Sequence, residues 1–452
     1  MSTLNKMTTK PEQAVYTLVV GLGKTGLSVV RYLRALGEIV VVADSRDIPP
    51  NLNVLKNDYS DVALYVGKFD VALFNNAHRI IVSPGVALTE PALIEARKNN
   101  VEIIGDIDLF ADEVKVPVVG ITGSNGKSTV TALLALMASQ ANLNSIASGN
   151  IGMPVLNSLD DDIDLYVLEL SSFQLESLQC LPMKAAVVLN ISADHLDRYE
   201  NLAAYTVSKQ AIYENAETLV LNKDDALASR VITHDTNNVV KQLYFTLGVP
   251  AKNEFGLCGD HLCFGSRKLI ATNQLKVKGR HNLQNALAAL TLGYATGLQF
   301  KDMLAALKAF KGLPHRTQFV ATINDVDWIN DSKATNVGAT VAALTGLPGK
   351  HILIAGGIAK GADFSELAAV VKKHCRAVIL LGEDAKKIQS VLPEGIVVKR
   401  VTDMQAAVIA AQKLAQSGDN VLLAPACASF DMFENFEQRG DIFMQAVEAL
   451  KP

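Results

Sequence analysis

The strongest candidate for chemistry is a glycine-rich loop, GSNGKST, that runs from Gly123 to Thr129 after an apolar stretch and before a helical one. Backbone N–H groups of such a loop bind phosphate oxygens, Lys127 neutralises their charge, and the Ser128 hydroxyl is a Mg²⁺ ligand. Ile121 stands where the standard motif has its first glycine, so the loop is short. The pattern predicts phosphate binding, and a solvated turn is the alternative.

Polar side chains follow the next two apolar stretches. Glu169 lies at the end of residues 164–170, and Asp194 and His195 follow residues 185–190. Parallel sheets bind ligands at the carboxyl ends of their strands, and a buried carboxylate is costly unless it is paired or bound to a metal. These residues are candidates for holding a metal ion. A structural ion pair for Glu169 and a hydrogen-bonded loop histidine for His195 are the alternatives.

A second glycine turn, GLGKTG at residues 21–26, lies near the start of the chain, and Asp44 ends the next apolar stretch. This spacing is typical of a dinucleotide-binding domain, in which the carboxylate holds a ribose. Arg46 beside Asp44 also suits a different nucleotide. The turn therefore indicates NAD, another nucleotide or a purely structural bend.

Basic and hydroxyl residues gather after the predicted strands of the last third of the chain. Lys333 and Thr335 follow the stretch around Trp328, Lys360 follows a glycine pair, and Ser429 follows residues 420–423. Each alone is compatible with a surface turn. Together they indicate a site for an anionic substrate.

The elements that carry these residues are short apolar runs alternating with helical stretches, which is typical of α/β domains with largely parallel sheets. We expect three such domains, at residues 1–105, 106–312 and 313–452, with a small antiparallel element near residues 241–278.

Composition narrows the possible partners. The 452 residues include 42 Lys and Arg against 46 Asp and Glu, a net charge of -4, so nucleic acid is not expected as a partner. Five scattered cysteines predict neither a disulfide framework nor a zinc site. No run of about 18 apolar residues predicts a membrane span, and residues 1–13 lack the apolar centre of a signal peptide. We expect a cytoplasmic protein.

Taken in order, the motifs resemble those of the Mur ligase family. They span essentially the whole chain, and the short phosphate loop is also the family's form. The motifs lie at residues 21–26, 44–46, 122–129, 169–174, 194–198, 209, 281–285, 312–316, 330–336 and 429–440. Ser45, where Thr is common, and Ile358 with Ala359, in a turn that is often more polar, are mild departures from the family's pattern.

The resemblance implies an N-terminal Rossmann-like domain that binds UDP, a central ATPase domain and a C-terminal Rossmann-like domain. The motifs are most similar to those of members that join D-glutamate to UDP-N-acetylmuramoyl-L-alanine in peptidoglycan precursor synthesis. ATP would be the co-substrate, two Mg²⁺ ions the cofactors, and an acyl phosphate the intermediate. Neither NAD nor zinc is implied, and we expect a monomer.

The resemblance also implies residue roles. The ATP-binding residues would be Gly123, Ser124, Asn125, Gly126, Lys127, Ser128, Thr129, Asn285, Arg316 and Asp331. The UDP-substrate residues would be Thr25, Asp44, Ser45, Arg46, Asn150, Ser171 and Gln174. The D-glutamate residues would be Lys333, Thr335, Lys360, Ser429, Phe430 and Phe436. The metal ligands would be Ser128, Glu169, His195 and a carbamylated Lys209. The catalytic residues would be Lys127, Glu169, His195, Lys209, Lys333 and Lys360.

Lys209 is the least obvious of these, because a lysine on a helical stretch is usually a solvated charge. An ammonium group cannot bind Mg²⁺, which takes oxygen ligands, whereas the carbamate formed with CO₂ can. The amine must be neutral to react, so this role requires that the pKa of Lys209 be lowered.

Overall fold

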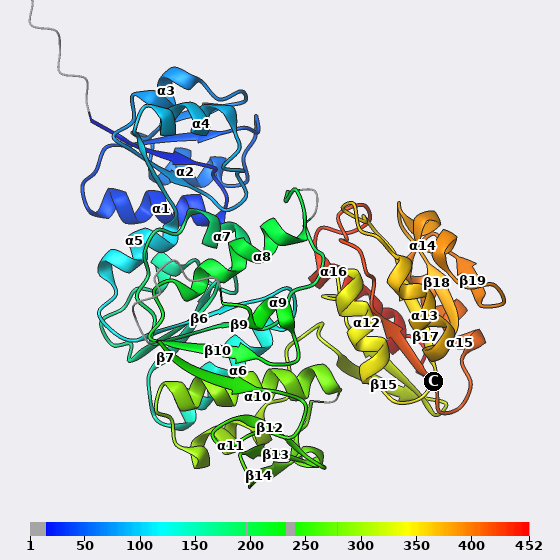
Figure 1. Cartoon of the computed structure of the whole chain (residues 1–452). Helices are drawn as coiled ribbons and strands as arrows, with labels where there is room; N and C mark the ends of the chain where they lie inside the picture. The colour runs from blue at the N-terminus through cyan, green and yellow to red at the C-terminus, as the bar shows by residue number, and fades with distance from the viewer. Residues whose placement is uncertain (1–14, 196–197, 232–239, 278, 452) are drawn as a thin grey trace, which may run out of the picture. The chain divides into compact units, whose positions relative to one another are not determined.

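The computed structural model describes residues 15–195, 198–231, 240–277 and 279–451. Within them the chain builds three sheets flanked by helices (Figure 1). Its contacts divide it into two compact units. One consists of residues up to Lys115 with Ser148–Asp161 and Phe173–Leu181, and the other of Val116–Ala147, Asp162–Ser172 and the chain from Pro182 onward. Among the described residues, no helix is long and apolar enough to cross a membrane.

The first sheet lies wholly in the first unit and has the strand order β3-β2-β1-β4-β5. Its paired strands are parallel. This is the Rossmann-type order, which places a ligand crevice where the order reverses, beside β1. The strands are β1 (Thr17–Val20), β2 (Val40–Asp44), β3 (Ala63–Val66), β4 (Arg79–Val82) and β5 (Glu102–Ile104). The helices are α1 (Lys24–Ala35), α2 (Leu52–Asp58), α3 (Val71–Asn75), α4 (Pro91–Lys98) and α5 (Asp106–Glu113).

The second sheet has the order β14-β13-β12-β11-β10-β9-β6-β8-β7. It is parallel from β8 to β12, and only β12, β13 and β14 pair antiparallel. The antiparallel element is therefore confirmed. It begins at β12, because β11, which starts at Lys241, is parallel to both of its neighbours. The strands are β6 (Val118–Thr122), β7 (Ser145–Gly149), β8 (Leu165–Glu169), β9 (Ala185–Val188), β10 (Thr218–Asn222), β11 (Lys241–Phe245), β12 (Phe255–Cys258), β13 (His261–Phe264) and β14 (Arg267–Ala271).

A helical layer covers this second sheet and completes its core. Helices α6, α10 and α11 pack side by side (Figure 1), and their Leu, Ala and Val side chains are buried together with those of the strands. The helices around this sheet are α6 (Lys127–Gln140), α8 (Leu202–Gln210), α9 (Ala226–Ser229), α10 (Arg280–Ala295) and α11 (Phe300–Ala309). A further helix, α7 (Ser172–Ser177), belongs to the first unit from Phe173 onward. Burial on both faces explains why β6, β8 and β9 are apolar except at their ends, where β6 has Thr122 and β8 has Glu169.

The third sheet has the order β15-β16-β20-β17-β18-β19, with only β15 antiparallel. Apolar clusters lie on both of its faces, as the alternation of strands and helices predicts. The strands are β15 (Gln318–Ile323), β16 (Val326–Asn330), β17 (His351–Ala355), β18 (Cys375–Leu380), β19 (Val397–Arg400) and β20 (Asn420–Leu423). The helices are α12 (Val337–Gly346), α13 (Ser365–His374), α14 (Ala385–Val391), α15 (Met404–Leu414) and α16 (Phe436–Glu448).

Candidate active site

The glycine-rich loop joins the buried strand β6 to α6, as its sequence predicts. Gly126 caps the helix with a φ of +87°, and a Cβ there would lie 2.3 Å from the Asn285 side-chain oxygen. Only glycine combines that backbone conformation with such a close approach. The N-terminus of α6 consequently presents its N–H groups beside Asn285, one of the predicted ATP-binding residues.

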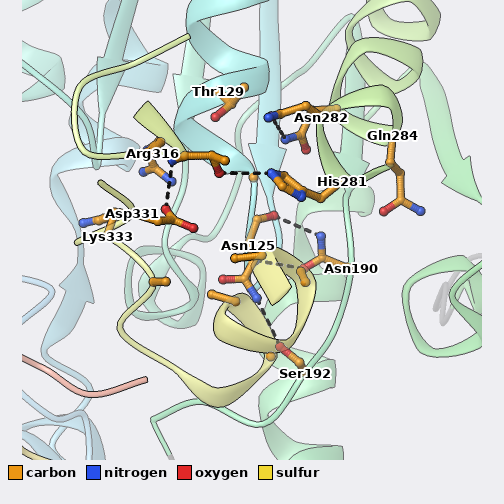
Figure 2. Close-up of a pocket in the computed structure, with 18 of the residues that line it drawn as sticks. Asn125, Thr129, Asn190, Ser192, His281, Asn282, Gln284, Arg316, Asp331 and Lys333 are labelled. Atoms are coloured by element: carbon orange, nitrogen blue, oxygen red, sulfur yellow. Dashed lines mark hydrogen bonds between the residues drawn. The ribbon is translucent and has the colours of Figure 1, made fainter. Parts of the chain in front are cut away.

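A neighbouring loop, which follows β9, holds the glycine-rich loop in place (Figure 2). Asn125 N–H donates to Asn190 Oδ1 at 2.8 Å, and Asn190 Nδ2 donates back to Asn125 O at 3.0 Å. Ser192 N–H donates to Ser124 Oγ at 2.9 Å. The sequence analysis assigned Asn190 and Ser192 no role. The signal that could have found them is their position directly after an apolar strand, the same signal that pointed to Glu169.

Two half-buried cations, Lys127 and Arg316, lie at the start of α6. Lys127 Nζ donates to Gly123 O at 2.7 Å, and Arg316 donates to Ser128 Oγ at 2.6 Å. Burial lowers the pKa of Lys127 and of Arg316, whereas the charge of Glu169, at the end of β8, acts to raise both. A polyphosphate would offset the desolvation of these cations, because several negative charges would then face them.

Lys209 on α8 belongs to the same cluster. Its side chain is only 1% exposed, and Nζ lies 4.6 Å from the centroid of the Tyr205 ring. Burial first, and then the charge of Lys127, hold the pKa of Lys209 well below its ordinary value. The solvated-lysine alternative is therefore wrong, and the lowered pKa favours the neutral amine that carbamylation requires.

A cavity of about 340 Å³ lies beside the loop (Figure 2). Six of the predicted ATP-binding residues line it, namely Asn125, Gly126, Thr129, Asn285, Arg316 and Asp331. Burial raises the pKa of Asp331 to about 6, although Thr317 N–H donates to its carboxylate at 3.2 Å. Other lining residues, to which the sequence analysis assigned no role, include Asp225, His281, Gln284 and Thr317.

Two of the residues predicted as metal ligands, Ser128 and Glu169, offer hard oxygen donors. Ser128 and Glu169 are both buried, and the influence of Glu169 on the pKa of Lys127 and Lys209 places its charge within this cluster. Hydroxyl and carboxylate oxygens suit Mg²⁺. His195 has a φ of +54°, and its Nε2 lies 3.8 Å from Asp194 Oδ2. Among the described residues, no three His, Cys, Asp or Glu side chains form a preassembled metal centre.

The residues predicted to receive D-glutamate fall into two groups. Lys333 Nζ lies 3.8 Å from the centroid of the Phe436 ring, and Thr335 N–H donates to Lys333 O at 2.8 Å. Burial, together with the charge of Arg316, lowers the pKa of Lys333 to about 8.

The second group lies on the loops that follow β17 and β20. Lys360 has a φ of +51°, Ser429 is buried, and Phe430 is 65% exposed. Backbone hydrogen bonds in both directions between Ile358 and Ala428 join the two loops. The structure therefore brings Lys360, Ser429 and Phe430 onto adjacent loops.

In the first unit, Asp44 organises the other glycine turn. Its carboxylate accepts from Leu22 N–H at 2.7 Å and from Arg46 through three N–H groups at 2.6–2.9 Å. Burial acts to raise the pKa of Asp44, but these bonds leave it lowered. Thr25 on α1 lies beside the same turn, and Ser45 and Arg46 are exposed.

The remaining predicted UDP-substrate residues lie elsewhere in the chain. Asn150 is exposed and Gln174 is buried, both in the first unit, whereas Ser171 belongs to the second.

Models of three successive Mur ligase domains match this chain. The model of the MurD-like N-terminal domain of Mur ligases matches residues 15–105, and the Mur ligase middle domain matches residues 121–293. The glutamate ligase domain of Mur ligases matches residues 315–427. The chain belongs to the Mur ligase family. The resemblance seen in the sequence is thereby confirmed.

Curated relatives of this Mur ligase match it over nearly its full length. A UDP-N-acetylmuramoylalanine–D-glutamate ligase of Nitrosococcus oceani is 52% identical over 449 residues, 98% of each chain. The Pseudomonas aeruginosa protein of the same name is 48% identical over 443 residues, 96% of this chain and 98% of its own.

Solved structures support the fold. A pseudomurein peptide ligase type C from Methanothermus fervidus has a TM-score of 0.61 at 21% identity, covering 96% of this chain and 100% of that one. The UDP-N-acetylmuramate-alanine ligase of Thermotoga maritima has a TM-score of 0.59 at 18% identity, with the same coverage. The three-domain α/β fold implied by the sequence is confirmed.

Proposed function

We propose that this Mur ligase joins D-glutamate to UDP-N-acetylmuramoylalanine, with conversion of ATP to ADP and phosphate. Near full-length relatives at 52% and 48% identity carry that name. The observation that carries the proposal is the cluster of cations at the start of α6, where Lys127 donates to Gly123 O and Arg316 donates to Ser128 Oγ. ATP and a nucleotide-linked precursor as substrates favour the cytoplasm.

The reaction has two steps. A carboxylate oxygen of the precursor attacks the γ-phosphorus of ATP, the bond to the ADP oxygen breaks, and an acyl phosphate forms. The amine of D-glutamate then attacks the acyl carbon, phosphate leaves and the amine loses a proton. Lys127, Arg316 and Lys333 would neutralise the charge on the transferring phosphoryl group. Positioning and electrostatic stabilisation supply most of the catalysis in such transfers.

We include two Mg²⁺ ions in this proposal. Ser128 and Glu169 would hold one, and His195 and a carbamylated Lys209 the other. When bound, the ions would neutralise charge on the phosphate oxygens. The burial and lowered pKa of Lys209 support the carbamate, since a buried neutral amine can react with CO₂ whereas an ammonium cannot.

The two remaining substrates would be held by residues that flank this centre in the sequence. The UDP end of the precursor would bind at Thr25, Asp44, Ser45 and Arg46, with Asn150, Ser171 and Gln174 along the rest of the molecule. D-Glutamate would bind at Lys333, Thr335, Lys360, Ser429, Phe430 and Phe436. Because Asp44 already accepts from Leu22 and Arg46, we assign it to shaping the turn while Arg46 meets the anionic nucleotide. Family membership favours UDP over NAD here.

A phosphate-release assay tests the proposal. Release should require ATP, UDP-N-acetylmuramoylalanine and D-glutamate together, with L-glutamate as the matched control substrate. Lys127→Ala should abolish release, because it removes charge stabilisation of the phosphoryl group. Lys386 is exposed, so Lys386→Ala serves as the control variant and should retain phosphate release. Phosphate release that does not depend on D-glutamate, or a folded Lys127→Ala enzyme with near wild-type turnover, would contradict the proposal.

A further inference from the structure

The Asn336 side chain links the N-terminus of α12 to the glycine-rich loop of residues 123–129, called the phosphate loop below. Its Oδ1 caps the helix by accepting from Ala339 N–H at 2.8 Å. Its Nδ2 donates to Asp194 Oδ2 at 3.0 Å and to Asn125 Oδ1 at 3.3 Å. Asn336 follows β16, whereas Asn125 and Asp194 belong to the loops after β6 and β9. The Asn336 amide therefore caps α12 and also links it to two loops of the second sheet.

The first turn of α12 also comes so close to these loops that a side chain at Gly338 would have to displace Ser192. A Cβ on Gly338 would lie 2.9 Å from Ser192 Oγ and 3.2 Å from Ser192 Cβ. Figure 2 shows Ser192 joined to Asn125 by a hydrogen bond at this edge of the cavity. The requirement for glycine is spatial, since Gly338 has no positive φ.

Helix α12 rests on the central elements at its other end as well. A Cβ on Gly346 would lie 3.0 Å from His281 Nδ1, at the start of α10. Between the two ends, Gly338, Ala339, Ala342 and Ala343 line the same cavity as the phosphate loop. The face of α12 that carries these small residues therefore forms part of the wall of the cavity beside the phosphate loop.

We propose that Asn336 is a positioning residue that sets the register of α12 on the phosphate loop, and that Gly338 fixes the distance of approach. The inference rests on the proposed ligase function. Lys333 lies on the short segment between β16 and α12, so the register of α12 decides where Lys333 meets the loop that carries Lys127. Nucleotide binding and the register of α12 should consequently be coupled.

Substitutions at Asn336 separate helix capping from this bridge. Asn336→Ser keeps a capping oxygen but removes both amide donors, so the fold should persist. The KM for ATP, and the Kd for the ATP analogue AMP-PNP with Mg²⁺ by calorimetry, should rise about tenfold, the effect of losing a hydrogen bond to a charged group. The KM for the UDP substrate should stay within about twofold, because only the register of α12 changes. The control Asp403→Ser alters the cap of α15, where Asp403 accepts from Ala406 N–H at 2.8 Å, and should change neither.

An exchanged pair tests the bridge directly. Asn336→Asp retains the cap but places a second carboxylate against Asp194, so it should weaken AMP-PNP binding more than Asn336→Ser does. The double variant Asn336→Asp with Asp194→Asn again pairs an amide donor with a carboxylate acceptor, now at exchanged positions. Its affinity for AMP-PNP should be higher than that of either single variant. A non-additive cycle of this kind identifies direct contact.

Gly338→Ala separates function from stability. Alanine favours a helix over glycine, so the thermal stability should hold or rise. The added Cβ should push α12 off Ser192 and raise the Kd for AMP-PNP about tenfold, and Ser192→Gly should restore binding by removing the opposing side chain. A merely structural role would instead lower stability and affinity together.

Two results would overturn the inference. One is AMP-PNP binding within about twofold of wild type in both Asn336→Ser and Gly338→Ala, and the other is an exchanged pair no better than Asn336→Asp alone. Failure of the proposed function is distinguishable, because a wild-type enzyme without D-glutamate-dependent turnover would still give interpretable AMP-PNP affinities.

Discussion

Lys333 should weaken the fold of its own domain at neutral pH. Burial, followed by the charge of Arg316, lowers its pKa from 10.5 to about 8. The folded pKa is the lower one, so the cost of keeping Lys333 protonated is fully present below pH 8 and is lost as the pH rises toward 10.5. At 1.36 kcal/mol per pKa unit, that cost is about 3 kcal/mol at pH 7 and about 1 kcal/mol at pH 9.5.

Lys333→Met removes this charge and keeps the aliphatic stem against Phe436. The cation–π contact, with Nζ 3.8 Å from the ring centroid, contributes about 1 kcal/mol in the opposite direction. The variant should therefore raise the free energy of unfolding by about 2 kcal/mol at pH 7 and by less than about 1 kcal/mol at pH 9.5. It should also lose ligase activity, which would show that the charge is retained for function.

The chain's single tryptophan provides the assay. Trp328 lies in β16 and is 1% exposed, so its fluorescence during urea titration reports unfolding of the sheet beside Lys333. Lys386→Met, an exposed lysine in the same domain, is the control and should change stability by less than about 0.5 kcal/mol. A loss of stability in Lys333→Met at pH 7, or a gain that is the same at both pH values, would refute the reasoning.

Three further predictions follow from the site. Lys209→Ala should be nearly inactive and partly rescued by small carboxylates, and a fully active variant would refute the carbamate. Calorimetry should detect saturable binding of UDP-N-acetylmuramoylalanine and none of NADH, and the reverse would overturn the assignment of the turn that Asp44 organises. Gly126→Ala should abolish ATP binding, because its Cβ would lie 2.3 Å from Asn285 Oδ1 and its φ is +87°. Unchanged ATP affinity in Gly126→Ala would show that the loop accommodates a side chain at this position.

The parts of this enzyme that are predictable from sequence are those set by local pattern. The glycine-rich loop, Glu169 and Lys333 each lie at or after the end of a strand that is largely apolar, and parallel strands deliver their carboxyl ends to one edge of a sheet. The elements of the third domain follow for the same reason, since β17 and β20 are apolar after their first residues, His351 and Asn420, and are buried along their whole length.

The parts that escaped prediction depend on tertiary contact. Nothing in the residues around Lys209 distinguishes a buried amine from a solvated one, because its burial comes from packing that the local pattern does not specify. Asn336 reads simply as a helix cap, and its second role exists only because Asn125 and Asp194, 211 and 142 residues away, reach it. Asn190 had a visible signal, but an amide at a strand end is common in loops.

The central claim is an ATP-dependent ligation through an acyl phosphate, and an isotope experiment tests it most directly. UDP-N-acetylmuramoylalanine labelled with ¹⁸O in its carboxylate is incubated with ATP, Mg²⁺ and D-glutamate, and product and phosphate are analysed by mass spectrometry. The account predicts a D-glutamyl amide product and one ¹⁸O atom in each phosphate released, because the attacking carboxylate oxygen leaves with phosphorus. Phosphate without label, or label transfer without the amide product, would contradict it.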